Sequence, residues 1–271
     1  MKRFSLCVLC VLLFSLAVGS QSILTADGLA AFVPPAATGG GGSDDLTGIG
    51  IRYVADDVSG TDGTAVSAWA DSGGGGYNLA QATSGNKPVI RVSAVNSHRA
   101  VEFDGVNDFL SVSLVPPSAL GTTTASAAFI VMKQAGTQNQ NTALSTDNTT
   151  PINVFASYSD SLIYDNAGTS GSQRLSVSQP VGWDDAWHII ECHRSGTSMS
   201  ILVDGVSIGT GSGNGVNFSQ SGTFNLYIGS YLGVAVWFKG QIAEVRVYNG
   251  DKDSTSSSNI RGALKTTYGT P

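Results

Sequence analysis

The sequence predicts an all-β protein, an antiparallel β-sandwich of two sheets with one short helix at its C-terminus. The composition is the first reason. The 271 residues include 34 Gly, and only 13% of residues are charged, a profile typical of many short strands joined by tight turns. The second reason is a series of alternating or apolar runs with turn residues, rather than helices, between them. These runs are RAVEFD, FLSVSL, SAAFIVMK, SLIYDN, WHIIECHR, SMSILVD, FNLYIG and QIAEVRVY.

One hairpin and one helix are predicted in more detail. The pair Asp204-Gly205 separates the apolar runs SILV and VSI, and it suits a type I′ turn because both central residues need positive φ. Residues 254–268 begin with Ser-rich capping positions and then show apolar residues at a spacing of four, which predicts a short helix lying on the sandwich. The apolar residues of that helix are Ile260, Leu264 and Tyr268.

The strand predicted within residues 238–249 should bury one of its two faces. Successive side chains of a strand point to opposite sides of the sheet. We therefore expect Ala243, Val245 and Val247 on the core face, and Ile242 on the opposite face with Glu244.

The N-terminal residues predict a secretory signal peptide over residues 1–20. A basic start is followed by a run of apolar and small residues that is too short to span a bilayer, and then by a small-residue exit. Residues 21–50 are Pro- and Gly-rich and predict a flexible linker, so the folded domain would span residues 51–271. Removal of the leader leaves Cys192 as the single cysteine, which predicts a buried, inert thiol and no internal disulfide.

The charge pattern argues against two classes of partner. The formal net charge is −6, and Lys and Arg do not cluster with interleaved aromatic residues. We therefore expect no nucleic-acid partner. After leader cleavage we also expect no insertion into a membrane.

Several segments, in this order, resemble the concanavalin A-like lectin/glucanase superfamily, and specifically its laminin G-like branch. The resemblance implies a jelly-roll sandwich from about residue 53 to 269, a binding role toward carbohydrates, and in many relatives a Ca²⁺ ion. The matching segments are AVSAWADSGGGGYNLAQAT, RAVEFDGVNDFLSV, AWHIIECHRSGTSMSILVDG, LYIGS, FKGQIAEVRVYN and LKTTYG.

No catalytic residues are predicted. Glucanases of the superfamily carry a Glu-x-Asp-x-x-Glu strand, and the stretch from Glu102 fails this pattern at Asn107. A retaining glycosidase needs two carboxyl groups, and Asn107 cannot exchange a proton. On an extended strand His188 would also point away from Glu191 and His193, so the three could not bind one metal ion.

Exposed aromatic residues are the candidates for carbohydrate binding. Trp69 and Trp187 lie in segments shared with the family and are assigned to packing. The residues Trp183, Tyr231 and Trp237 flank Gly-rich or turn segments. We expect these three to form a platform for sugar rings.

Calcium is the only cofactor that the resemblance implies. Asp71, in the segment ADSGGGG, resembles the family's Asp-x-Ser-Gly turn, and Asp56 or Asp57 could supply a second carboxylate. Ala243 stands where many relatives have an acidic residue, which weakens the prediction. The alternative is a turn in which Asp71 accepts hydrogen bonds from nearby backbone.

Three functions remain open from the sequence. The first is a secreted, non-catalytic, lectin-like protein at the cell surface or in the extracellular space, with a glycan or an extracellular surface protein as its partner. The second is a structural or adhesive component of a cell surface or virion that uses the sandwich for protein contacts. The third, less favoured, is a glycoside hydrolase or polysaccharide lyase. Fold analogy alone carries the first hypothesis.

Overall fold

The structure is a computed structural model that describes residues 43–271 except 123, 148–153, 166–172 and 214–220. The predicted signal peptide lies outside the described residues, as does the predicted linker up to residue 42. Within the described part, no helix combines the length and the apolar character needed to cross a bilayer.

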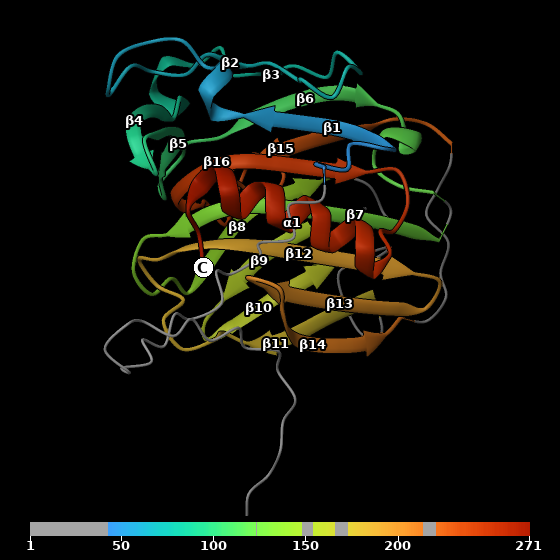
Figure 1. Ribbon diagram of the computed structural model, residues 1–271. Helices are drawn as coiled ribbons and strands as arrows, with labels where there is room; N and C mark the ends of the chain where they lie inside the picture. Colours follow the sequence, from blue (N-terminus) through green and yellow to red (C-terminus); the bar gives the residue numbers. More distant parts are fainter. Residues whose placement is uncertain (1–42, 123, 148–153, 166–172, 214–220) are drawn as a thin grey trace, which may run out of the picture. The chain divides into compact units, whose positions relative to one another are not determined.

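Two antiparallel sheets form the sandwich (Figure 1). In the first sheet the strands follow the order β14-β13-β12-β7-β16-β5-β4, and β1 pairs with β16. Its strands are β1 (Ile49–Val54), β4 (Val89–Val95), β5 (His98–Asp104), β7 (Ala125–Gln134), β12 (Trp187–Ser195), β13 (Ser198–Val203), β14 (Val206–Ser212) and β16 (Lys239–Tyr248).

The second sheet follows the order β11-β10-β9-β8-β15-β6-β3-β2. Together with the first sheet it confirms the predicted all-β sandwich. Its strands are β2 (Ala68–Trp69), β3 (Leu79–Ala80), β6 (Leu110–Val115), β8 (Gln140–Thr146), β9 (Val154–Tyr158), β10 (Ser161–Asp165), β11 (Arg174–Ser178) and β15 (Phe224–Ile228). In the described part of the chain, three short 3₁₀ turns join strands: Ala55–Asp57, Ser84–Asn86 and Pro117–Ala119.

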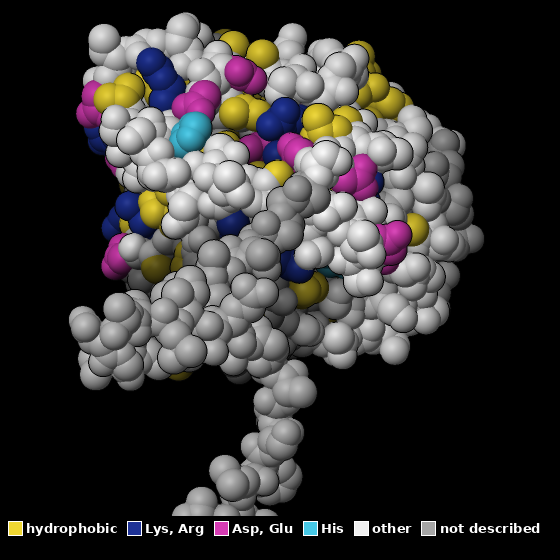
Figure 2. All heavy atoms as spheres, viewed as in Figure 1, with side chains coloured by type: hydrophobic (Ala, Val, Ile, Leu, Met, Phe, Trp, Pro, Cys, Tyr) yellow, Lys and Arg dark blue, Asp and Glu magenta, His cyan; other side chains and the backbone are white. Residues whose placement is uncertain are grey.

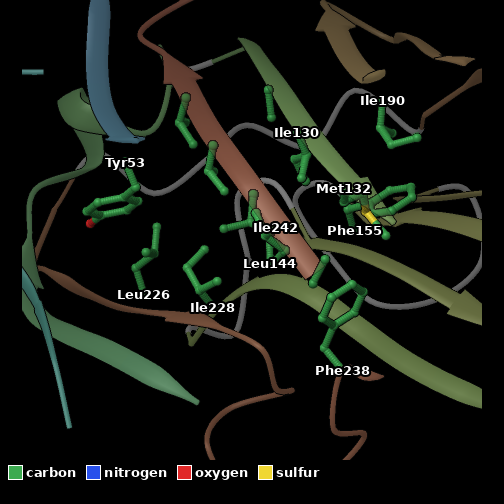
Figure 3. Close-up of a cluster of buried hydrophobic side chains, with 14 of the residues drawn as sticks. Tyr53, Ile130, Met132, Leu144, Phe155, Ile190, Leu226, Ile228, Phe238 and Ile242 are labelled. Carbon is green, nitrogen blue, oxygen red and sulfur yellow. The ribbon is translucent and has the colours of Figure 1, made fainter. Parts of the chain in front are cut away.

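The core lies between the two sheets, where apolar side chains from both inner faces meet (Figure 3). Trp69 is fully buried in it, and its indole N–H donates to the carbonyl of Val54 at 2.8 Å. This contact confirms the packing role expected for Trp69. The core residues labelled in Figure 3 are Tyr53, Ile130, Met132, Leu144, Phe155, Ile190, Leu226, Ile228, Phe238 and Ile242.

The prediction for the two faces of β16 was correct for one half of the strand only. A register shift lies between Ile242 and Glu244, in the pairing of β16 with β7. Val245 and Val247 reach the central core as expected, but so does Ile242, whereas Ala243 belongs to a second apolar cluster on the outer side. A β-bulge inserts one residue and so reverses the alternation of faces.

The predicted C-terminal helix is confirmed as α1 (Ser254–Tyr268). The Asp253 side chain caps its N-terminus by accepting from the Ser256 N–H at 2.7 Å, and Gly269 ends the helix with a φ of 62°. Its apolar residues are buried in the second cluster, on the outer face of the first sheet. These residues are Ile260, Leu264 and Tyr268.

The β13–β14 hairpin turns at Asp204 and Gly205, whose φ angles are 54° and 88°, as the Asp-Gly pair predicts. The Asp204 carboxylate has a further role that the turn pattern does not show. It accepts from the N–H of Ile189 at 2.8 Å and lies 2.7 Å from Nδ1 of His188. The turn is thereby tied to β12.

Candidate functional site

A groove of about 290 Å³ lies on the outer face of the second sheet. We call it the tyrosine groove, because Tyr158 and Tyr231 line it together with Thr142, Ile163, Asp165 and Arg174. Strands β8 to β11 and the segment after β15 supply these residues. Segments far apart in the sequence therefore build one surface.

The strand register builds the floor of the tyrosine groove. Thr142 on β8 lies opposite Ala156 on β9, and Ala156 lies opposite Ile163 on β10. Two residues further along β9, Tyr158 points to the same side and remains 49% exposed. A small, largely apolar floor next to an exposed ring suits the flat C–H face of a sugar.

An ion pair forms the polar end of the groove. Nε and Nη2 of Arg174 donate to the two oxygens of Asp165, each at 2.7 Å. Burial raises the pKa of Asp165, although the Arg174 guanidinium opposes this effect, and the bond to Asp165 in turn raises the pKa of Arg174. Pairing through two hydrogen bonds fixes the orientation of the guanidinium and of the carboxylate, so that both groups can hydrogen-bond a ligand hydroxyl.

The segment 229–238 supplies the remaining wall. The Ser145 hydroxyl on β8 donates to the carbonyl of Ser230 at 2.8 Å, and the Thr142 N–H donates to the carbonyl of Val236 at 3.2 Å. Val236 lines the groove with a φ of 52°, an unusual conformation for a β-branched residue. Strained backbone of this kind often occurs at binding sites.

The three predicted aromatic residues do not form one platform. Tyr231 lies in the tyrosine groove. Trp237 is half-buried on the same segment but packs against Phe109, with ring centres 5.9 Å apart. The expectation of an exposed Trp183 was wrong, because its side chain is only 3% exposed and its ring stacks on His188 at 5.1 Å.

Two of the predicted calcium ligands, Asp71 and Asp56, are hydrogen-bonded to different parts of the chain. Asp71 Oδ1 accepts from the N–H groups of Arg52 and Gly73 at 3.0 and 2.8 Å, and its Oδ2 accepts from the N–H of Tyr77 at 3.1 Å. Asp56 is separately bound to the N–H of Arg99 and to the ring of His98. Across residues 43–271, excluding the undescribed segments, no three acidic, His or Cys side chains gather as metal ligands do. Asp71 and Asp56 therefore each have hydrogen-bond partners of their own, as in the alternative of a turn held by Asp71.

Glu102 is held as a carboxylate by its neighbours. Arg91 Nη2 donates to one oxygen at 2.7 Å and Gln241 Nε2 donates to the other at 2.6 Å, and the bond to Arg91 lowers the pKa of Glu102. Asp108 is a second acidic residue near Glu102. Burial and the neighbouring Asp104 raise the pKa of Asp108 to about 6. Its Oδ2 accepts from the Asp104 N–H at 3.0 Å within the turn. Asp108 therefore has a structural partner of its own.

His188 and His193 have different hydrogen-bond partners, and Cys192 is buried in the core. His188 bonds to Asp204, whereas His193 lies 2.8 Å from Asp251 and 3.5 Å from Glu191. This arrangement agrees with the prediction that the three residues named as metal candidates do not converge. Cys192 is buried as expected, and burial raises the pKa of its thiol.

The sequence reasoning missed three residues of the groove: Tyr158, Asp165 and Arg174. One signal for Asp165 was present, because alternation in SLIYD places Ile163 and Asp165 on one face and Tyr164 on the other. The pairing of Asp165 with Arg174 depends on the register of β10 and β11, which neither strand shows alone.

The family assignment agrees with this architecture. A family model of laminin G type, described as the concanavalin A-like lectin/glucanases superfamily, matches residues 104–255. The match covers more than half of the chain, and the chain belongs to this superfamily. No curated protein shows a significant sequence match to the chain.

Solved structures with the same fold include binding domains of botulinum neurotoxins. The serotype D binding domain has a TM-score of 0.57 at 9% identity, over 83% of this chain and 56% of that chain. The DC binding domain, in complex with rat synaptotagmin II, has a TM-score of 0.53 at 13% identity, over 81% of this chain and 52% of that chain. A third structure is described by the dependence of cell entry of botulinum neurotoxin type C on two ganglioside molecules. It has a TM-score of 0.53 at 12% identity, over 81% of this chain and 52% of that chain. The chain spans about half the length of these structures, and the likeness shows the fold alone.

Proposed function

We propose that the chain is a secreted, non-catalytic carbohydrate-binding protein whose ligand lies in the tyrosine groove. One observation carries the proposal: Tyr158 and Tyr231 flank a small floor that ends at the Asp165–Arg174 pair. Such a site offers an aromatic surface for sugar C–H groups and charged hydrogen-bonding groups for hydroxyls. The apolar lead of residues 1–20 supports export to the extracellular space.

A binding role, rather than catalysis, is supported from two directions. Glu102 is held as a carboxylate by Arg91, and the superfamily's second catalytic carboxyl is replaced by Asn107. A retaining mechanism needs one carboxyl that gives up a proton and a second that attacks. Two neurotoxin structures of similar fold are binding domains by their descriptions, and the description of a further neurotoxin structure names two ganglioside molecules.

A glycan array tests the proposal directly. The mature chain should bind at least one glycan class, equally with and without calcium, and Tyr231→Ala should weaken that binding about five- to thirtyfold, since loss of one stacking ring costs on the order of 1–2 kcal/mol. Val181→Ala is the matched control, because Val181 is fully exposed and lies outside the groove. Binding that survives both Tyr231→Ala and Arg174→Met unchanged would place the ligand elsewhere.

A protein partner is the alternative that the same experiment separates. If the array shows no binding to acidic, neutral or plant-type sugars, the sugar proposal fails. Capture of a single extracellular protein, lost on Tyr231→Ala, would then assign the groove to protein contacts.

A further inference from the structure

A second groove, of about 460 Å³, lies on the outer face of the first sheet, across strands β12, β13 and β14. We call it the hydroxyl groove. It lies on the side of the sandwich that carries α1, whereas the tyrosine groove lies on the outer face of the other sheet. No residue of one groove lines the other.

The strand register arranges its polar groups in two rows of three. Neighbouring strands lie about 4.8 Å apart, and side chains on one face repeat about every 6.8 Å along a strand. None of the five hydroxyl groups in these rows bonds to another described residue, so all five are available to a ligand. The rows are Ser195, Ser198 and Ser212, and His193, Ser200 and Thr210.

A buried charge pair closes one end of the hydroxyl groove. His193 is 8% exposed, and its Nδ1 lies 2.8 Å from Asp251 Oδ1. Its Nε2 lies 3.5 Å from Oε2 of Glu191, which is fully buried. Arg261 donates to the other oxygen of Glu191 at 2.6 Å, but within the described residues Oε2 has no hydrogen-bond partner. Glu191 does not line the groove, so its carboxylate acts on the groove through His193, whose Nε2 it faces.

The charges of the groove select a neutral ligand. His193 and Asp251 are its charged lining residues, and their opposite charges cancel when His193 is protonated. Arg261 and Lys252 line the adjoining hollow, where they pair with Glu191 and Asp45. In Figure 2, charged side chains of both signs lie in small scattered groups over the coloured part of this view. Hydroxyl groups both donate and accept hydrogen bonds. The matching ligand is therefore uncharged and rich in hydroxyl groups.

We propose that the hydroxyl groove is a second carbohydrate-binding site, specific for a neutral oligosaccharide lying across β12, β13 and β14. Among the described residues no Phe, Tyr or Trp lines the site, so it recognises hydroxyl groups rather than the face of a sugar ring. Together with the tyrosine groove, a point that rests on the proposed function, it makes the chain bivalent. Two sites on opposite faces can bridge two glycan chains.

Nuclear magnetic resonance of the ¹⁵N-labelled mature chain tests this site separately from the other. The probes are cellohexaose, maltohexaose and laminarihexaose, with a polygalacturonate hexamer as the charged comparison. At least one neutral probe should shift the amide signals of Ser198–Ser200 and Thr210–Ser212, and the charged hexamer should not. No shift there with any neutral probe at millimolar concentration would overturn the proposal.

Variants then identify the contact. The double variant Ser200→Val with Thr210→Val removes two hydroxyls but keeps residues that favour strands, and it should weaken binding at this site at least tenfold. Ser207→Val is the matched control, because Ser207 lies on β14, the strand of Thr210, but outside the groove. Shifts that persist in the double variant would contradict the assignment.

A Tyr231→Ala background keeps the two proposals distinguishable. In that background the signals near Thr210 should still respond to the neutral probe while those near Tyr158 do not. Responses confined to the tyrosine groove of the unmodified chain would refute the second site and leave the first in place. Responses confined to Thr210 and its neighbours would refute binding in the tyrosine groove and leave the second site in place.

Discussion

Arg174 lies directly opposite Asp165 in the antiparallel pair of β10 and β11, and its guanidinium bonds to both oxygens of that carboxylate. Asp165 is 2% exposed, while the arginine side chain is more than one-third exposed. The pair therefore depends on Arg174 to satisfy a carboxylate that is largely removed from water.

Arg174→Met should lower the free energy of unfolding by about 1–3 kcal/mol, because it leaves a buried carboxylate without its charged partner. Urea unfolding measures the change. Arg174→Lys should recover only part of it, since an ammonium group cannot make the two-point contact. The double variant Asp165→Leu with Arg174→Met should recover most of the loss, and a double variant less stable than Arg174→Met would contradict this account.

Asp71 should act as a structural turn residue independent of calcium. Its carboxylate accepts three backbone N–H groups, so Asp71→Ala should reduce stability by about 1–3 kcal/mol. Thermal unfolding of the unmodified chain should give the same Tm in millimolar CaCl₂ and in EDTA. A calcium-dependent rise in Tm that Asp71→Ala abolishes would show that Asp71 is a ligand.

His193 should make the stability fall in alkaline solution. Asp251 and Glu191 raise the pKa of His193 from 6.5 to about 9, against the opposing effect of burial. The folded state thus holds this proton more tightly than the unfolded state, so the contribution is complete below pH 6.5 and is lost as the pH rises toward 9. Unfolding at pH 6.5 and 9.5 should show a smaller loss for His193→Gln than for the unmodified chain. Equal losses would mean that His193 does not titrate in this range.

Asp108 should make the stability depend on pH in acidic solution. Burial raises the pKa of Asp108 from 3.8 to about 6, so between these values the folded state keeps a proton that the unfolded state has lost. Its contribution to the free energy of unfolding therefore falls as the pH rises from about 4 to about 6. Asp108→Asn keeps an oxygen for the Asp104 N–H and should remove this part of the pH dependence. An unchanged profile between pH 4 and pH 6 would refute the shift.

Local patterns were sufficient for most of the fold. The alternating runs predicted strands, the Asp-Gly pair predicted its turn, and the spacing of Ile260, Leu264 and Tyr268 predicted α1. The inward position of Ile242 could not be predicted from local patterns. A bulge depends on how two strands pair, and the run QIAEVRVY alternates in the same way with or without one.

The candidate site was less accessible than the fold. Tyr231 was named from its neighbouring Gly and turn residues, and the structure places it in a groove. The same reasoning failed for Trp183, because the exposure of an aromatic residue in a turn depends on what packs over it, here His188 and Phe155. Tyr158 and Arg174 become neighbours of Tyr231 only once β8 to β11 are assembled.

Tyr231 and Trp237 share a short segment between β15 and β16, two strands whose inward side chains belong to the core. Its attachment to β8 runs through the Ser145 hydroxyl and through backbone groups. Substitutions at the exposed Val234 would therefore leave the sandwich and these anchors intact, whereas Gly233 has a φ of 70° and a Cβ there would lie 3.1 Å from Phe109 and Tyr227. The groove wall can therefore change its surface chemistry without any change to the two sheets that carry it.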